Sequence, residues 1–296
     1  MSPPEPAGNA TPLGESDLGR ARDELAICRG VEAHQANLFE ISFASPEVAR
    51  AASPGEFAQI LVAERPIPLL RRPFSFSRVD AAAGLVTFYL GEVGAGSRQL
   101  RQFRPGQEAR ILGPLGRGFS LPEQPGRTVV VAGGLGAAPF PFLIDRLIAA
   151  GERVVWINGA RSAAELYPEQ SVPPGLAEAV LRTEDGSMGE RGLVTDGLVQ
   201  RLDGVGRLYA CGPNPMLAAV TDVWRAARAD GGRVGPLEVS IEAPMGCGFG
   251  TCLGCAVPLV GADAHRPWAL CCRQGPVFPA DSLDWPRLLS QPAHLG

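Results

Sequence analysis

The chain contains no lysine, since all 27 of its basic residues are arginine. A lysine that grips phosphate in a P-loop or forms a Schiff base is therefore excluded. Histidine is nearly as scarce, because the sequence of 296 residues contains only His34, His265 and His294. So few scattered imidazoles give poor support for a histidine-based metal site or a Ser-His-Asp triad.

Long apolar and long basic runs are also missing. Residues 128–144 form the most apolar uncharged run, but glycine and proline break it and it ends at Asp145, so it predicts no membrane span. A net charge of -4 without a basic cluster argues against nucleic acid as a partner. Residues 1–21 lack the apolar core of a signal peptide. We expect them to form a disordered tail on a cytoplasmic protein.

The pattern of apolar residues and the composition change twice after that tail, which predicts three domains. Residues 22–125 consist of short apolar runs separated by Gly and Pro, a pattern typical of an antiparallel β-barrel. In residues 126–238, strand-like and helix-like segments alternate, as in a doubly wound α/β sheet. Residues 239–296 hold five of the seven cysteines and predict a small third domain.

The cysteine-rich segment carries the clearest chemical signal. Cys247, Cys252 and Cys255 form a C-x4-C-x2-C run, and a further cysteine follows at Cys271 or Cys272. This is the plant-type spacing for a 2Fe-2S cluster, in which four thiolates hold two irons. Structural zinc favours two short cysteine hooks, and disulfide frameworks favour small secreted domains, so both alternatives are weaker. We expect the adjacent pair in an extended segment, where neighbouring side chains point to opposite sides and only one reaches the iron.

Glycine-rich turns in the middle domain suit a dinucleotide. The first, at Gly133, Gly134 and Gly136, follows an apolar strand and offers backbone N-H groups and a helix N-terminus to phosphate. A turn needed only for packing would look the same. The motif CGPNPM at residues 211–216 and the polar loop at residues 183–192 also follow strands. We expect them at the same carboxyl edge, where ligands bind in open α/β sheets.

Two segments of the barrel half suit a flavin. Residues 71–75 (RRPFS) bring cations, an aromatic ring and a hydroxyl together, and residues 91–97 (GEVGAGS) add glycine N-H groups and a second hydroxyl. Arg72 would contact phosphate, Phe74 the ring and Ser75 the reactive nitrogen. Taken alone, the arginines at 71 and 72 would be interpreted as solvated edge charges.

In this order and spacing, the motifs resemble those of the ferredoxin-reductase superfamily, most closely the electron-transfer subunit of NAD-dependent dihydroorotate dehydrogenase. The resemblance covers residues 26–285. The matching motifs are R-P-x-S at 72–75, G-x-G-T at 94–97, G-P-L-G-R-G-F at 113–119, G-G-x-G-x-A-P at 133–139, C-G-P-x-P-M at 211–216 and C-x2-G-P-V-F at 272–278. The last alignment selects Cys272 over Cys271. Departures are Ser97 for Thr and Glu56 for Gln, both of which stay polar, together with the N-terminal extension and the doubled cysteine.

The resemblance implies FAD, NAD and a 2Fe-2S cluster as cofactors of an NAD(P)H-dependent flavoprotein oxidoreductase subunit. It implies reversible electron transfer from NADH to an FMN-containing dihydroorotate dehydrogenase catalytic subunit of pyrimidine biosynthesis, in a heterotetramer. No catalytic side chain is expected beyond the cofactors. The expected cofactor contacts are Arg72, Pro73, Phe74, Ser75, Tyr89, Gly94, Gly96, Ser97, Gly133, Gly134, Gly136, Arg161, Asp185, Cys211, Gly212 and Pro213. The expected cluster ligands are Cys247, Cys252, Cys255 and Cys272.

Three points stay open at the level of sequence. Arg161 stands where arginine selects NADP in related reductases, although the resembled family has Gly-Ala-Arg here and uses NAD, so we expect NADH to be preferred. The acceptor could also be an oxygenase or a hydrogenase, and a zinc-stabilised interaction module is the alternative without redox chemistry. A short cluster domain leaves its cluster near the surface, so we expect a docking face, with Val277, Phe278 and Trp285 as candidates. The more ordinary role of these three residues is to close the small cluster domain.

Overall fold

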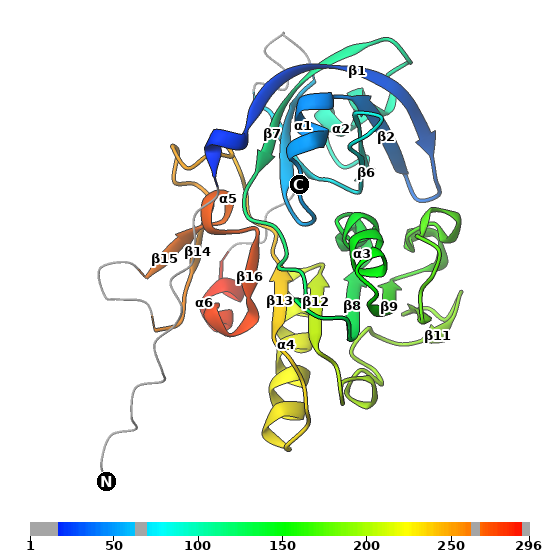
Figure 1. Cartoon of the computed structure of the whole chain (residues 1–296), viewed down its shortest axis with the longest axis vertical. Helices are drawn as coiled ribbons and strands as arrows, with labels where there is room; N and C mark the ends of the chain where they lie inside the picture. Colours follow the sequence, from blue (N-terminus) through cyan, green and yellow to red (C-terminus); the bar gives the residue numbers. More distant parts are fainter. Residues whose placement is uncertain (1–16, 63–69, 262–266, 292–296) are drawn as a thin grey trace.

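The computed structural model describes residues 17–62, 70–261 and 267–291. An antiparallel sheet (blue to teal) and a mostly parallel sheet (green to yellow) lie end to end, each with seven strands (Figure 1). The cysteine-rich segment (orange to red) lies at one side, beside the junction of the two (Figure 1). No helix in the described part of the chain combines the length and the apolar composition that crossing a bilayer requires.

The first sheet curls into a half-barrel around an aromatic core. Its strand order is β4-β3-β7-β1-β2-β6-β5 and each ladder is antiparallel. Phe39, Phe43 and Phe88 are fully buried inside it, as the short alternating apolar runs predict. The elements are β1 (Arg22–Ala33), β2 (Leu38–Ala44), α1 (Pro46–Ala51), β3 (Phe57–Leu61), β4 (Arg72–Ser75), β5 (Arg78–Asp80), β6 (Leu85–Gly91), α2 (Ala95–Arg101) and β7 (Glu108–Leu115).

The chain is already ordered before β1. The 3-10 helix η1 (Leu18–Arg20) is capped by Asp17, whose carboxylate accepts a hydrogen bond from Gly19 N at 2.9 Å. Arg20 lies 2.9 Å from the buried Glu56 carboxylate. The expected disordered tail is therefore wrong for residues 18–21, and residues 1–16 lie outside the described part of the chain.

The second sheet has helices on both faces, which confirms the doubly wound α/β prediction. Its strand order is β11-β10-β9-β8-β12-β13-β16, parallel except for the β13–β16 pair. On β8, Val129 and Val131 share a core with α4, whereas Val130 and Ala132 share one with α3. The elements are β8 (Arg127–Gly133), η2 (Gly134–Ala137), α3 (Phe140–Ala149), β9 (Arg153–Ala160), η3 (Ala163–Glu165), η4 (Glu169–Ser171), β10 (Glu178–Thr183), β11 (Glu190–Arg191), η5 (Val199–Arg201), β12 (Arg207–Cys211), α4 (Asn214–Ala229) and β13 (Leu237–Ser240).

The cysteine-rich segment completes this second sheet. Its strand β16 pairs with β13, where Phe278 lies opposite Val239. The expected border between residues 238 and 239 therefore falls inside β13. The elements of the segment are β14 (Ala256–Pro258), β15 (Trp268–Leu270), α5 (Cys271–Gln274), β16 (Val277–Pro279), η6 (Ala280–Ser282) and α6 (Trp285–Leu289).

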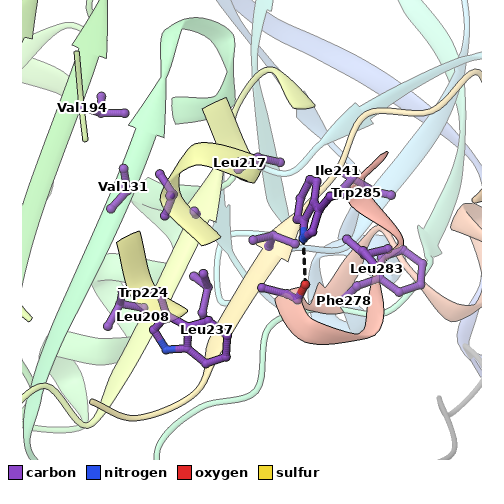
Figure 2. Close-up of a cluster of buried hydrophobic side chains, with 14 of the residues drawn as sticks. Val131, Val194, Leu208, Leu217, Trp224, Leu237, Ile241, Phe278, Leu283 and Trp285 are labelled. Atoms are coloured by element: carbon purple, nitrogen blue, oxygen red, sulfur yellow. Dashed lines mark hydrogen bonds between the residues drawn. The ribbon is translucent and has the colours of Figure 1, made fainter. Parts of the chain in front are cut away.

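A continuous apolar core joins the cysteine-rich segment to the α/β sheet. Figure 2 shows Phe278, Leu283 and Trp285 next to Ile241, and the same core extends to Trp224 on α4. The Trp285 indole donates to the Ala280 carbonyl at 2.9 Å, the dashed line of Figure 2. The expectation that Val277, Phe278 and Trp285 form a docking face is wrong, because all three are buried within the chain itself.

Candidate cofactor sites

The two strand-end turns singled out in the sequence touch one another. β8 and β12 are neighbours in the sheet, so their carboxyl ends lie side by side. A Cβ added to Gly136 would stand 2.3 Å from the Cys211 carbonyl oxygen, and one added to Gly133 would stand 2.3 Å from the Met216 sulfur. Only glycine allows this approach, so the two motifs build one site.

A cavity of about 820 Å³ opens at these turns, between the sheet and the half-barrel. Five predicted contacts line it: Gly133, Gly134, Gly136, Arg161 and Pro213. The half-barrel contributes the segments 36–38 and 91–93, which sequence reasoning did not assign to the nucleotide. Such a cleft over strand ends and a helix N-terminal turn suits a dinucleotide.

Carboxylates surround the one predicted cation in this cavity. The Arg161 guanidinium donates from Nε and Nη2 to the two Glu165 carboxylate oxygens, at 3.0 and 2.5 Å. Glu165 and Glu184 line the cavity beside Arg161. Asp185, the expected contact from the same loop as Glu184, instead accepts hydrogen bonds from Ser187 and is absent from the lining. Pairing with Glu165 reduces the attraction of Arg161 for a phosphate group.

A second cavity, of about 580 Å³, lies between the flavin motif and the cysteine-rich segment. The predicted contacts Pro73, Phe74 and Ser75 line it from β4, and Met245 lines it from the segment that leads to Cys247. The cavities share part of their walls, which brings ligands in the two within reach of one another. The shared residues are Val93, Leu135, Gly136, Pro213, Pro215 and Glu242.

Glu242 is the charged residue of this shared wall. It follows the end of β13 by two residues, and desolvation by the surrounding protein raises the pKa of its carboxyl above the ordinary value. Nearby Cys211 lines the second cavity, and burial, followed by the Glu242 charge, raises the pKa of its thiol to about 12. Sequence reasoning missed Glu242, although an acidic residue directly after a strand of a nucleotide-binding sheet is a usable signal.

Other predicted contacts lie outside both cavity walls and stay predictions. Ser97 Oγ accepts from Val93 N at 3.0 Å and Gly94 N at 3.1 Å, so it braces the glycine loop before α2. Tyr89 is buried with its ring edge-on to Tyr167, 4.7 Å between centroids. The predicted contacts that line neither cavity are Arg72, Tyr89, Gly94, Gly96, Ser97, Asp185 and Gly212.

The loop that carries Cys247, Cys252 and Cys255, called the cysteine loop below, has backbone N-H groups directed at sulfur atoms. Backbone N-H groups of Cys252 and Cys272 donate to the Cys247 and Cys255 sulfurs, both at 3.5 Å, and the Cys255 and Cys272 sulfurs lie 3.2 Å apart. Gly248 has a φ of +83°, a conformation that favours glycine. N-H groups directed at sulfur stabilise thiolates, which are the ligands of an iron-sulfur cluster.

Two of these thiols have lowered pKa values. Burial opposes ionisation of Cys247, but hydrogen bonds from backbone N-H groups outweigh it and lower the pKa of the thiol to about 7. The hydrogen bond with Cys272, against the opposing effect of burial, lowers the pKa of Cys255 to about 6. In the described residues, no three His, Cys, Asp or Glu side chains converge as ligands of a single ion do. In a 2Fe-2S cluster each iron takes two of four thiolates, which is the donor set that these cysteines supply.

Cys271 and Cys272 begin the short helix α5, so the expectation of an extended pair is wrong. Successive residues of a helix point about 100° apart, and the two thiols have different surroundings. Both thiols are buried in the same apolar core, but the Cys272 sulfur faces that of Cys255, whereas the Cys271 sulfur lies 4.0 Å from the Ile241 carbonyl. All seven cysteines are free, so no disulfide framework exists.

A half-barrel beside a doubly wound sheet, with adjoining cavities and a cysteine loop, defines a flavoprotein oxidoreductase of the ferredoxin-reductase type. One solved structure of this type, an NADH-dependent reduced ferredoxin-NADP oxidoreductase, is 26% identical with a TM-score of 0.76, and the match covers 90% of this chain and 92% of that one. A Neisseria gonorrhoeae ferredoxin NADP+ reductase with bound FAD and NADP, 17% identical with a TM-score of 0.56, shares the fold over 69% of this chain and 91% of that one.

Residues 242–284 match the family model described as the iron-sulfur cluster binding domain of dihydroorotate dehydrogenase B. The dihydroorotate dehydrogenase B (NAD(+)) electron transfer subunit of Desulforamulus reducens is 36% identical over 253 residues, which cover 84% of this chain and 93% of that protein. The same subunit from Geobacillus thermodenitrificans is 37% identical over 244 residues, covering 82% and 91%. The chain belongs to this family of electron transfer subunits.

Proposed function

We propose that the chain carries electrons from NADH to an FMN-containing dihydroorotate dehydrogenase catalytic subunit, with FAD and a 2Fe-2S cluster as its resident cofactors. The observation that carries the proposal is the pair of adjoining cavities, one at the strand-end glycines and one that extends toward the cysteine loop. When bound, FAD accepts two electrons as hydride and releases them singly, which links a nicotinamide to a one-electron cluster.

In this proposal the residues divide by cavity. The glycines at 133, 134 and 136 offer N-H groups and close backbone approach to the dinucleotide phosphates. Pro73, Phe74 and Ser75 hold the flavin ring, and Glu242 stands where the two cavities share a wall. The remaining expected contacts are assigned to FAD (Arg72, Tyr89, Gly94, Gly96, Ser97) and to NAD (Arg161, Asp185, Gly212, Pro213), and Cys211 lines the flavin cavity.

Cys247, Cys252, Cys255 and Cys272 are the proposed cluster ligands. Cys252 is exposed and Cys247 is half-buried, so this side of the loop faces solvent, where a cluster can pass electrons to a partner. No side chain for the chemistry of dihydroorotate is assigned to this chain, because that reaction takes place on the partner. We place the complex in the cytoplasm, a reducing compartment compatible with seven free thiols.

Protein purified without oxygen tests the cofactor content. We expect bound FAD, two irons and two labile sulfides per chain, and a visible spectrum that NADH bleaches under anaerobic conditions. Zinc without visible absorption would instead support an interaction module. Flavin and iron without bleaching by NADH would reject the nucleotide assignment while leaving the cofactors in place.

A further inference from the structure

Gln59 is a buried amide whose hydrogen bonds are not made within the protein. Its side chain is fully buried on β3, and neither Nε2 nor Oε1 has a hydrogen-bond partner among the residues that the structure describes. An unpaired buried polar group costs about 1–3 kcal/mol, so a residue of this kind calls for a ligand.

The alternation of β3 turns Gln59 away from the half-barrel. Ala58 and Ile60 lie in the barrel core, whereas Phe57 lies on the opposite face with Gln59 and shares a core with Cys255 and Cys272. Phe57 also lines the cavity assigned to the flavin ring. Gln59 therefore lies on the strand face that joins that cavity to the cysteine loop.

The Gln59 amide contacts the cysteine loop itself. A Cβ added to Gly248 would stand 2.6 Å from Gln59 Nε2 and 2.6 Å from its Cγ, so the amide occupies the space that a side chain at 248 would need. Gly248 directly follows Cys247. The cysteine loop therefore has glycine at position 248, where the neutral amide of Gln59 contacts it.

We propose that Gln59 donates its side-chain N-H to a sulfur of the iron-sulfur cluster and thereby raises the cluster's reduction potential. Reduction adds negative charge, and a hydrogen bond to sulfur stabilises that charge. The donor is supplied by the half-barrel, so the fold that holds the flavin also sets the potential of the cluster. This inference rests on the proposed function only in that the cysteine loop binds the cluster.

Redox titration of the cluster, followed by the EPR signal of its reduced form, tests the proposal in Gln59→Leu and Gln59→Met. Both variants remove the donor at similar volume, and methionine also keeps the unbranched shape. We expect iron and flavin to be retained and the reduction equilibrium to shift about tenfold toward the oxidised cluster, or 59 mV for one electron. Gln99→Leu, on α2, removes a glutamine with a buried unpaired oxygen elsewhere in the half-barrel, and should leave the potential unchanged.

An unchanged potential in both Gln59 variants would overturn the proposal. Loss of the cluster from both, with flavin retained, would also overturn it, because Gln59 would then only support the shape of the loop. A wild-type protein without iron would instead overturn the proposed function, so the two failures are distinguishable.

Discussion

At the scale of single residues, two neighbouring cysteines have different environments. The Cys272 sulfur lies 3.2 Å from the Cys255 sulfur, and the Cys272 N-H donates to the same atom, whereas the Cys271 sulfur is buried beside the Ile241 carbonyl and faces no other thiol among the residues that the structure describes. A cysteine of the second kind behaves as a small apolar side chain. The geometry therefore supports Cys272 as the fourth ligand.

Alanine variants of the pair check this assignment, because alanine removes the sulfur without supplying an oxygen ligand. We expect Cys272→Ala to lose iron and the EPR signal of the reduced cluster. Cys271→Ala should keep both and lose only some stability, about 1–2 kcal/mol for the removed buried sulfur. Iron analysis with EPR makes the measurement. The reverse pattern would assign Cys271 as the ligand.

The Arg161–Glu165 pair gives a residue-scale prediction about the nucleotide. Glu165 accepts hydrogen bonds from Arg161, the residue that would otherwise bind a 2'-phosphate. We therefore expect the wild-type protein to prefer NADH. Glu165→Gln weakens that pairing and removes a negative charge from the cavity. The ratio of kcat/KM for NADPH to that for NADH should rise about three- to tenfold.

Glu169→Gln on η4 is the matched control, because Glu169 is exposed and does not line the cavity. Its nucleotide preference should equal that of the wild type. An unchanged ratio in Glu165→Gln would mean that Arg161 does not meet the 2' position. Comparable efficiency with both nucleotides in the wild type would contradict the preference itself.

At the scale of elements, the contact between two turns determines the site. The β8–η2 turn and the β12–α4 turn touch at Gly136 and Cys211, where no room exists for a Cβ. Residues of both turns, Gly136 and Pro213 among them, form the wall that the two cavities share, so the distance between the turns determines the position of that wall. Adding one methyl group at this contact should therefore lower the stability of the protein and weaken nucleotide binding.

Gly136→Ala tests this contact. Overpacking should cost about 1–3 kcal/mol of stability, and the displaced turn should raise the KM for NADH. Thermal unfolding and steady-state kinetics measure the two effects. Gly30→Ala is the control, since a Cβ there meets nothing within 4 Å, and it should change stability by no more than about 0.5 kcal/mol. Equal behaviour of both variants would show that the turns can separate freely.

At the scale of the whole molecule, the cysteine-rich segment is part of the α/β sheet and leaves one face of its loop open. Of the residues expected to dock a partner, Phe278 and Trp285 are buried in that shared core (Figure 2), and Val277 is buried in the core on the other face of the sheet. The exposed apolar residues of the loop are instead Phe249, 40% exposed, and Leu253, 63% exposed. Leu253 stands between two proposed ligands, so it adjoins the solvent-facing side of the cluster site.

Co-expression with an FMN-dependent dihydroorotate dehydrogenase tests the assembly. We expect the two chains to co-purify as a heterotetramer and the catalytic subunit to gain NAD-linked activity. Leu253→Asp should weaken this association at least tenfold, about 1.4 kcal/mol, with the cluster retained. Aspartate tolerates the positive φ of +59° at this position, so the change adds little backbone strain.

Val199→Asp, on η5, is the control for the surface charge, because Val199 is 48% exposed on the α/β half. It should co-purify as the wild type does. Wild-type chains that never associate and show no NAD-linked activity would reject the dihydroorotate assignment and leave the flavin reductase function intact. Equal effects of both substitutions would place the interface elsewhere.

Features that depend on local spacing could be predicted from the amino-acid sequence. The C-x4-C-x2-C run, the strand-end glycines and the change from short strands to alternating strands and helices are readable because neighbours in the chain stay neighbours in the fold. The tertiary structure alone decided which cysteine of the adjacent pair faces Cys255, how Glu242 comes to border both cavities, and why the half-barrel residue Gln59 reaches the cysteine loop. These depend on contacts between residues far apart in the chain, and no local pattern encodes the direction in which a buried side chain meets another domain.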